Sequence, residues 1–449
     1  MKNKHIYPND YRAVSSSAGL PASENSFGIN LYALFIGIFF LVFIKYMRLN
    51  LDSITITLSF VGIITISVWL LEYLTQGSQS IIAQLKIRRK LSWKRLGFKL
   101  LGIGTIFSVL VIGYWLFPVY KDGLYIPYFQ MLKRYALPLL ILTFIYFCFM
   151  DKVEEEPQNA YWQLGRLLLG KKQDADKEEL IELFRGWGVK FFYLAIMLPF
   201  ANTRLDWFMH AEFKNIFRMP YDVFYFFNEL IFFIDLGFAT AGYIMTFKLF
   251  NTHIRSSEPT FLGWFVALSC YWPFWDNLIS PYYLSYNTGI YWSNLFTSGS
   301  FMFYFWTVLI LLCELIYCLG TIALGLRFSN LTYRGLITNG PYAYTKHPAY
   351  VFKNISWWLI SLPFMVAAQN PLLAIKGSLL LLGVNFIYYL RAKTEENHLS
   401  HYPEYVEYAL AMNKKSIFAP VAKIFPFLKY KAPTENQITI EELCKKEKQ

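Results

Sequence analysis

Charged residues are scarce in this sequence: Asp, Glu, Lys and Arg make up 16% of its 449 residues. Soluble domains normally carry about 25%, so this shortage excludes a water-soluble globular protein of this size. Cysteine and histidine are also rare, with five and six copies, and there is neither a CxxC pair nor a histidine at metal-ligand spacing. The sequence therefore offers no disulfide framework and predicts no metal site.

Hydrophobic residues dominate instead, at 55% of the chain, and they gather into long apolar runs. Runs of about 17 to 25 residues are long enough, as helices, to cross a hydrocarbon layer roughly 30 Å thick. They are too long and too uniformly apolar for the alternating strands of a membrane β-barrel. The sequence thus predicts an all-α, polytopic helical membrane protein with about ten transmembrane helices. The predicted spans are 31–47, 54–74, 97–117, 135–150, 189–200, 223–247, 261–279, 300–324, 352–368 and 372–390.

Basic residues predict the orientation of these spans. The densest basic cluster lies within residues 86–99, and such clusters stay in the cytoplasm. With ten spans, both termini, the segment 151–187 and the loop 327–350 then fall on the cytoplasmic side, while the loop 281–296, which has no Lys or Arg, falls outside. Cytoplasmic loops and attraction to anionic lipid account for the net charge of +12, so we do not expect a nucleic-acid partner.

Spans and tails divide the chain into four regions. Residues 1–26 form a polar cytoplasmic tail without the apolar core of a signal peptide, and residues 27–299 form an N-terminal membrane helical bundle. Within this bundle, the cytoplasmic segment 151–187 contains a helix-like stretch, 174–184, that we expect to lie on the membrane surface. Residues 300–430 form a membrane core that carries the polar motifs, and residues 431–449 form a charged cytoplasmic tail.

The first polar motif is GPYAYTKHPAY at residues 340–350. Pro348 suits the first position of a helix and disfavours helical geometry at His347, so Lys346 and His347 are predicted to lie at a helix start. Free backbone N–H groups and the positive end of the helix dipole make such a position an anion site. The motif therefore suits a carboxylate or phosphate of a ligand.

The second motif, RAKTEENHL at residues 391–399, follows two apolar segments joined by a tight turn at 369–371. These segments predict a helical hairpin, which returns the second motif to the same side of the membrane as the first. Arg391 and Glu395 are four residues apart and share a helix face, whereas Glu396 points about 100° away from Glu395. The hairpin would bring a cationic turn next to an acidic helix end, as an amino-acid zwitterion with an attached sugar requires.

The order of these motifs, followed by YPEYVEY at 402–408, resembles the isoprenylcysteine carboxyl methyltransferase and phospholipid methyltransferase superfamily over residues 300–426. The resemblance implies a membrane methyltransferase core with an S-adenosylmethionine site that opens to the cytosol. It implies that the cofactor is bound by Tyr344, Lys346, His347, Pro348, Tyr350, Glu395 and Glu396. It also implies that Arg391 lies near the transferring methyl group or the acceptor carboxylate, which makes Arg391 and His347 the candidate catalytic residues.

Three positions depart from the pattern of this superfamily. Lys346 stands where the family usually has Arg, the pair at 352–353 is Phe-Lys where a small residue is usual, and the pair at 401–402 is His-Tyr in place of Phe-Gly. Lysine is a poorer two-point carboxylate binder than arginine, so we expect the cofactor contacts to differ in detail.

The predicted acceptor is a membrane lipid or a lipidated molecule, with carboxyl O-methylation of the isoprenylcysteine type ranked first. A carboxylate needs no general base, whereas the amine of phospholipid N-methylation would need deprotonation by His347 or an acid. A sterol-reductase-like enzyme is another reading, although its NADPH would demand more phosphate-binding residues. A transporter or scaffold is the non-enzymatic alternative, in which the motif residues are interfacial anchors and a solvated helix face.

Two acids, Asp235 and Glu314, lie deep within predicted spans. Ionisable residues in lipid are costly and often functional, so these acids are predicted to line a cavity for the substrate or to pair across helices. The sequence leaves open the oligomeric state and the choice between a bacterial inner membrane and the endoplasmic reticulum.

Overall fold

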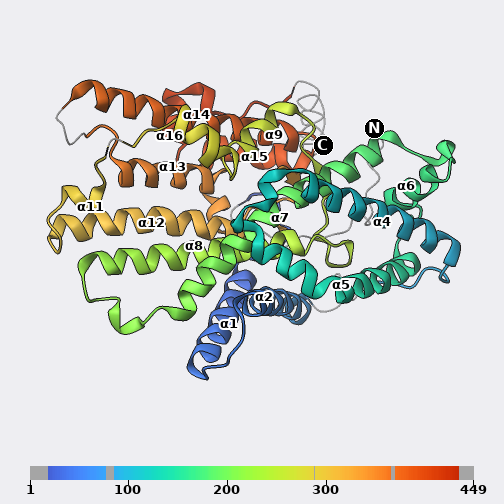
Figure 1. The fold of residues 1–449 in the computed structure, drawn as a ribbon. Helices are drawn as coiled ribbons and strands as arrows, with labels where there is room; N and C mark the ends of the chain where they lie inside the picture. The colour runs from blue at the N-terminus through green and yellow to red at the C-terminus, as the bar shows by residue number, and fades with distance from the viewer. Residues whose placement is uncertain (1–18, 77–84, 288, 366–369, 434–449) are drawn as a thin grey trace.

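The computed structural model describes residues 19–76, 85–287, 289–365 and 370–433, which fold almost entirely into helices (Figure 1). The only strands in these ranges, β1 (Ser256–Ser257) and β2 (Thr332–Tyr333), form one antiparallel pair. The predicted all-α class is therefore confirmed. The helices are α1 (Phe27–Tyr46), α2 (Ser53–Gln76), α4 (Trp93–Leu116), α5 (Ile126–Val153), α6 (Ala160–Leu168), α7 (Lys177–His210), α8 (Pro220–Ile244), α9 (Phe261–Leu268), α10 (Ser280–Tyr282), α11 (Trp292–Leu295), α12 (Phe301–Leu324), α13 (Pro348–Ser361), α14 (Pro371–Leu399), α15 (Pro403–Lys415) and α16 (Ala419–Ile424).

Within the described part of the chain, eight helices are long and apolar enough to cross a membrane: α1, α2, α4, α5, α7, α8, α12 and α14. This confirms a polytopic helical membrane protein, with two fewer long helices than the ten predicted spans. The seventh predicted span, 261–279, is broken because α9 ends at Leu268 and a turn containing Pro273 precedes a π-helix at Trp275–Ile279. The ninth, 352–368, coincides with α13, which ends at Ser361, and its residues 366–368 lie outside the described ranges.

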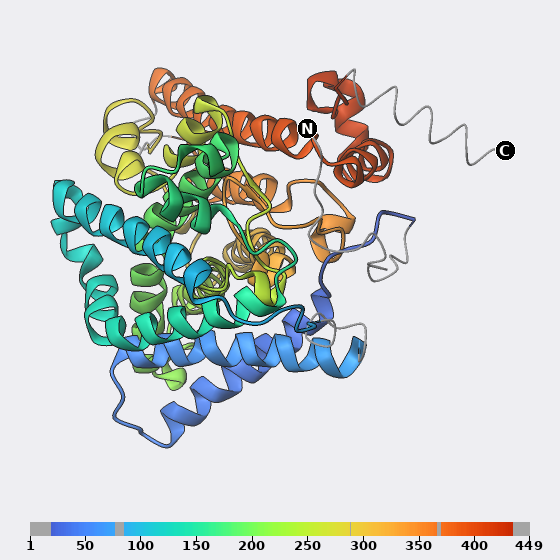
Figure 2. The same cartoon turned by 90° about the vertical axis from the view of Figure 1, so that its right-hand side faces the viewer.

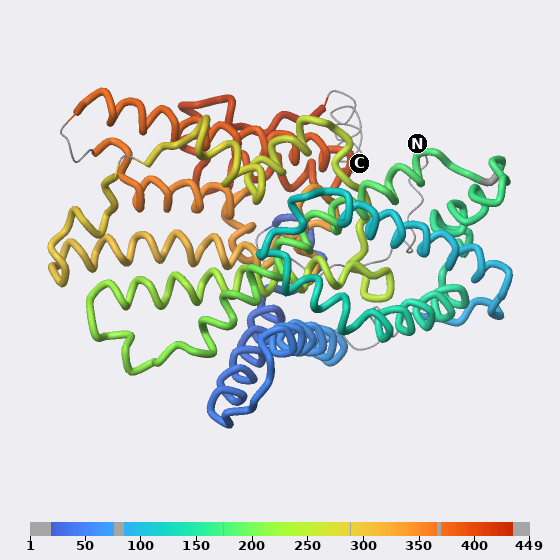
Figure 3. Tube along the Cα trace, in the orientation of Figure 1, coloured from blue at the N-terminus to red at the C-terminus, as the bar shows by residue number. Residues whose placement is uncertain are grey.

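Of these two shorter segments, α13 packs against α12, and the broken seventh span packs against α14. β1 pairs with β2 just beyond the C-terminal end of α12. At the other end, Trp292 of α11 packs on Phe303 in the first turn of α12, with ring centroids 4.8 Å apart. The chain between β1 and α11 must therefore pass from one end of α12 to the other, a path that the tube in Figure 3 follows. α13 and α14 form the predicted antiparallel hairpin, in which Trp358 Nε1 donates to Asn385 Oδ1 at 2.8 Å.

Segment 151–187 differs from its prediction. The stretch 174–184 is not a separate surface helix, because α7 runs for 34 residues and includes the fifth predicted span. Asp176 begins α7 by accepting hydrogen bonds from the N–H groups of Glu178 and Glu179, and the internal Pro199 does not end the helix. The predicted surface helix and the fifth predicted span are thus parts of one continuous helix, α7.

α6, also from this segment, crosses α4 at very short range. A Cβ atom on Gly102 would lie 2.1 Å from the Tyr161 carbonyl oxygen, and one on Gly165 would lie 2.0 Å from that of Phe98. Small residues that let two backbones touch are characteristic of membrane helix contacts. The segment therefore packs into the helical bundle.

Residues 19–26, predicted as the end of a polar tail, pack against the C-terminal core. Asn25 Nδ2 donates to the Ala323 carbonyl at the end of α12, and the Thr338 hydroxyl donates to the Pro21 carbonyl, both at 2.8 Å. Side chains of the segment and of the core therefore form hydrogen bonds with each other's backbone groups. Residues 1–18 and 434–449, which hold most of the two predicted tails, lie outside the described ranges.

The largest apolar cluster joins α1, α2, α7, α8 and α12. Phe60 of α2 is fully buried in it, with its ring centroid 5.0 Å from that of Phe233 on α8. Figure 2 shows α15 and α16, in red, at the end of α14 and far from the blue α1 and α2. The polar end of the α13–α14 hairpin consequently lies where the C-terminal core meets the N-terminal bundle.

Candidate active site

The two polar motifs meet at one end of the α13–α14 hairpin. Pro348 begins α13, so Lys346 and His347 lie immediately before the helix. Lys346 Nζ lies 2.6 Å and His347 Nε2 3.3 Å from Glu396 Oε1, while Lys393 Nζ lies 2.8 Å from the other oxygen of this carboxylate. Burial lowers the pKa of Lys346, and the Glu396 carboxylate opposes this shift. The buried acid thus ties the end of α14 to the start of α13.

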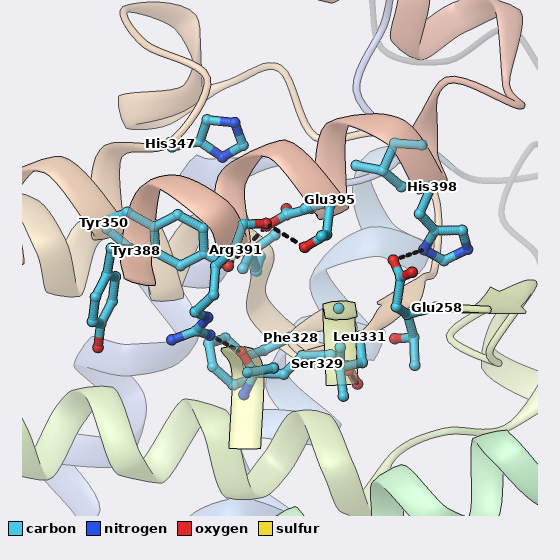
Figure 4. Close-up of a pocket in the computed structure, with 18 of the residues that line it drawn as sticks. Glu258, Phe328, Ser329, Leu331, His347, Tyr350, Tyr388, Arg391, Glu395 and His398 are labelled. Carbon is cyan, nitrogen blue, oxygen red and sulfur yellow. Dashed lines mark hydrogen bonds and ion pairs between the residues drawn. The ribbon is translucent and has the colours of Figure 1, made fainter. Parts of the chain in front are cut away.

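A cavity lies beside this contact, with walls from α9, α12, the loop 328–332, α13 and α14 (Figure 4). Its empty space, counted out to the open mouth, is about 1010 Å³. Because this volume includes open solvent at the mouth, it is an upper bound on the room for a ligand. The charged and imidazole side chains that line it are Glu258, His347, Lys353, Arg391, Glu395 and His398.

Arg391 lies in the cavity wall and is 5% exposed. Its Cζ lies 4.9 Å from the ring centroid of Tyr350, 5.1 Å from that of Tyr388 and 5.6 Å from that of Tyr271. Nη2 also donates to Asn330 Oδ1 at 3.1 Å. Cation–π contacts and this hydrogen bond hold the guanidinium in place. No carboxylate of the described residues forms an ion pair with it, so its charge is available to a ligand.

Glu395 also lines the cavity, whereas its neighbour Glu396 does not. Glu395 Oε2 accepts a hydrogen bond from the Tyr350 hydroxyl at 2.8 Å, and the Tyr350 ring lies parallel to the His347 imidazole with centroids 5.5 Å apart. The two acids therefore point in different directions, as predicted, and have different partners. One acid faces the cavity, and the other joins the two motifs.

Most residues of the cavity were not predicted from the sequence, and Glu258 and His398 are two of them. Glu258 follows β1, and its N–H donates to the Leu331 carbonyl at 2.8 Å, which brings an acid of the N-terminal bundle into the cavity wall. His398 Nδ1 lies 3.9 Å from Glu258 Oε2, and Nε2 lies 2.8 Å from Ser256 Oγ (Figure 4). A two-residue strand leaves no pattern that could have revealed Glu258. His398 could have been found, because it follows Glu395 by three residues and shares its helix face.

The predicted site residues that line the cavity are His347, Tyr350, Arg391 and Glu395. Lys346 and Glu396 lie beside it and pair with each other. The Pro348 ring lies over Gly320 of α12, outside the cavity lining. Tyr344 does not join the site: it belongs to the turn before Lys346 and is 62% exposed.

Asp235 and Glu314, the two predicted substrate residues, do not line the cavity. Asp235 of α8 accepts hydrogen bonds from the hydroxyls of Tyr317 and Thr321, which do line it, so this acid lies directly behind the cavity wall. Both oxygens of Glu314 accept from Asn228 Nδ2, at 3.0 and 2.9 Å. Both acids therefore pair with side chains of a neighbouring helix, which is one of the two roles predicted for them.

The fold and the cavity together define a class: a multi-pass helical membrane protein with a polar, ligand-sized cavity at one end of a helical hairpin. In the described ranges, no group of three or more His, Cys, Asp or Glu side chains could hold a metal ion.

Residues 302–401 match the sequence model of the isoprenylcysteine carboxyl methyltransferase (ICMT) family. The match runs from the start of α12 to just beyond α14 and includes both motifs, so the predicted resemblance is confirmed. This part of the chain is thus similar to a family of membrane methyltransferases. No curated protein and no solved structure gives a significant match to the chain.

Proposed function

We propose that this protein is an integral membrane methyltransferase that uses S-adenosylmethionine to methylate the carboxylate of a lipid or a lipidated acceptor. One observation carries the proposal: the cavity that combines Glu395, Arg391 and His347 lies between the two motifs of the matched region. Both anionic and cationic groups of a zwitterionic ligand would find a partner there.

The cavity side chains fit the groups of S-adenosylmethionine, which has an ammonium, a carboxylate, a sulfonium and two ribose hydroxyls. Glu395 and Glu258 would accept hydrogen bonds from the ammonium and the hydroxyls. His347 and the free N–H groups at the start of α13 would bind the carboxylate. Tyrosine rings such as Tyr388 would face the cationic sulfonium, as aromatic faces do for other organic cations.

S-Adenosylmethionine supplies a methyl group, whose carbon bonds to the acceptor oxygen while the carbon–sulfur bond breaks and its electron pair passes to sulfur. No proton has to be removed, because the charges of the carboxylate and the sulfonium disappear together. Arg391, fixed by its tyrosine rings, would orient the reacting groups, and the wall formed by α9 and Glu258 would exclude water. Positioning in a dry site would account for the rate.

We further propose that the cavity opens to the cytoplasm, where the cofactor is synthesised. The support is the basic cluster within residues 86–99 and the parity of the predicted spans, which assign the loop 327–350 to the cytoplasmic side. Either a bacterial inner membrane or the endoplasmic reticulum would meet this requirement.

Transfer of a labelled methyl group tests the proposal. Purified protein in lipid nanodiscs would be given methyl-labelled S-adenosylmethionine with either N-acetyl-S-farnesylcysteine or phosphatidylethanolamine. We expect label in the prenylcysteine, released as methanol by mild base, because methyl esters hydrolyse and N-methyl groups do not. Base-stable label in phosphatidylethanolamine would assign the protein to N-methylation instead, and the absence of label in both acceptors would count against the proposal.

A nicotinamide-dependent reductase is less well supported. Its cofactor carries several phosphates, whereas Arg391 and Lys353 are the only Arg or Lys side chains that line the cavity among the described residues. Loss of the label signal together with oxidation of NADPH by the purified protein would favour that reading.

A further inference from the structure

Lys353 lines the cavity, but it has no role in the cofactor contacts proposed above. It lies on α13 three residues after Tyr350, about one turn farther into the hairpin. Its Nζ lies 5.2 Å from the ring centroid of Tyr317 on α12 and 5.6 Å from that of Trp357. No oxygen atom of the described residues lies within ion-pair or hydrogen-bond distance of this ammonium group, so its three donors face the cavity space and the two rings.

Asp235 does not supply the missing partner at close range. Its charge attracts Lys353 through the wall, but both carboxylate oxygens already accept hydrogen bonds, from the hydroxyls of Tyr317 and Thr321. A cation inside a membrane hairpin is costly unless something binds it. The acid behind the wall lowers that cost and leaves the ammonium donors for a ligand.

The charges of the cavity can be compared with those of its proposed ligands. S-Adenosylmethionine brings two positive groups and one negative group. In the contacts proposed above, the acids Glu258 and Glu395 serve the ammonium and the hydroxyls, and tyrosine rings serve the sulfonium. Arg391 and His347 can serve the single negative group. Lys353 then has no counter-charge from the cofactor. An acceptor with a carboxylate supplies it, whereas a neutral amine acceptor would leave this partly buried ammonium unpaired.

We propose that Lys353 binds the carboxylate of the methyl acceptor, an amphiphile with one anionic head group on an apolar chain. This inference rests on the proposed function and specifies the acceptor end of the same cavity. The carboxylate pairs with the ammonium, and the rings of Tyr317 and Trp357 beside it contact the first carbons of the chain.

Direct binding and steady-state kinetics test the role of Lys353. Full-length protein in nanodiscs would be titrated with N-acetyl-S-farnesylcysteine, with its methyl ester and with farnesyl monophosphate. Lys353→Met keeps an unbranched apolar side chain and removes the charge. We expect it to weaken binding of the free acid, and to raise its KM, by about tenfold or more, with unchanged affinity for the ester and for S-adenosylmethionine. Lys353→Arg should retain most of the acid affinity.

Lys376→Met is the matched control, because Lys376 is exposed on the same hairpin, in α14, and does not line the cavity. It should bind all probes as the unaltered protein does. Equal binding of acid and ester by the unaltered protein, or no loss of acid binding in Lys353→Met, would overturn the inference, as would tighter binding of the monophosphate than of the acid. If Lys353→Met does not fold, the acid–ester comparison in the unaltered protein decides.

The two proposals fail in different ways. Methyl transfer to the acid that does not depend on Lys353 would leave the methyltransferase in place and remove the role of Lys353. Acid binding that depends on Lys353, without any binding of S-adenosylmethionine, would retain the carboxylate site and remove the proposed methyltransferase.

Discussion

Glu395 and Glu396 are adjacent in the sequence, yet their surroundings assign them different tasks. The Glu396 side chain is 4% exposed and contacts Lys346, His347 and Lys393, so it serves the fold. Glu395 lines the cavity and accepts a hydrogen bond only from the Tyr350 hydroxyl among the described groups, so most of its capacity remains for a ligand.

This difference predicts opposite effects for one type of substitution. Glu396→Gln removes the charge that neutralises neighbouring cations, and loss of one partner of a buried ion pair costs about 3 kcal/mol or more. We expect a clear fall in the thermal unfolding temperature, measured by tryptophan fluorescence in detergent. Glu395→Gln keeps an oxygen for the Tyr350 hydroxyl, so its unfolding temperature should not change, while its affinity for S-adenosylmethionine falls by about tenfold. The reverse pattern would show that the two roles have been exchanged.

At the residue level, the sequence predicted what depended on local chemistry. The helix start at Pro348 and the 100° step between the two acids follow from backbone rules, and the contact between His347 and Glu396 follows from a hairpin. Glu258 could not be predicted, because 73 positions separate it from Leu331, the residue that holds its backbone. Tyr344, a motif residue assigned by resemblance, is exposed and does not line the cavity.

Among the elements, the contact between α4 and α6 has the sharpest steric requirement. Gly102 faces the Tyr161 carbonyl oxygen so closely that a Cβ atom would lie 2.1 Å from it. Gly104, on the same helix, has nothing within 4 Å of a built Cβ atom. The two glycines therefore allow a matched comparison.

Gly102→Ala is expected to push α6 away from α4 and to reduce the free energy of unfolding by about 1–3 kcal/mol, the usual range for overpacking. Gly104→Ala should be neutral or stabilising by up to about 1 kcal/mol, because alanine favours the helix. Thermal unfolding of both variants in the same detergent measures the difference. Equal shifts in the two variants would argue against the close helix contact.

The length of the apolar runs predicted most of the long helices. The prediction was less accurate where a run is interrupted. α1, α2, α8, α12 and α14 occupy their predicted spans, and no proline interrupts these runs. α7 is longer than predicted, since the charged residues at its start also form helix and Asp176 caps it. The seventh span contains Pro273, whose missing N–H and fixed backbone angle end a regular helix, and the sequence alone did not tell where the chain would turn.

For the whole molecule, the N-terminal bundle has a structural reason to accompany the matched region, residues 302–401. Glu258, Ala267 and Tyr271 lie before the matched residues 302–401, and all three line the cavity. The pairing of β1 with β2 fixes their position against the domain. The matched region alone therefore lacks one wall of its own cavity.

A shortened chain tests this dependence. Residues 300–449, expressed without the bundle, should not bind S-adenosylmethionine, because the open cavity admits water and lacks Glu258. Co-expression with residues 1–299 should restore binding if the two parts reassemble, as measured by calorimetry after co-purification. Cofactor binding by the short chain alone, at the affinity of the full chain, would show that the bundle serves another purpose.

The central claim is that the cavity between the two motifs binds S-adenosylmethionine, and calorimetry on the full-length protein in detergent tests it most directly. We predict one cofactor molecule bound per chain, weakened about tenfold or more in Glu395→Gln and unchanged in Lys376→Met. Absence of any binding by the folded protein, or binding that Glu395→Gln leaves intact, would contradict the account.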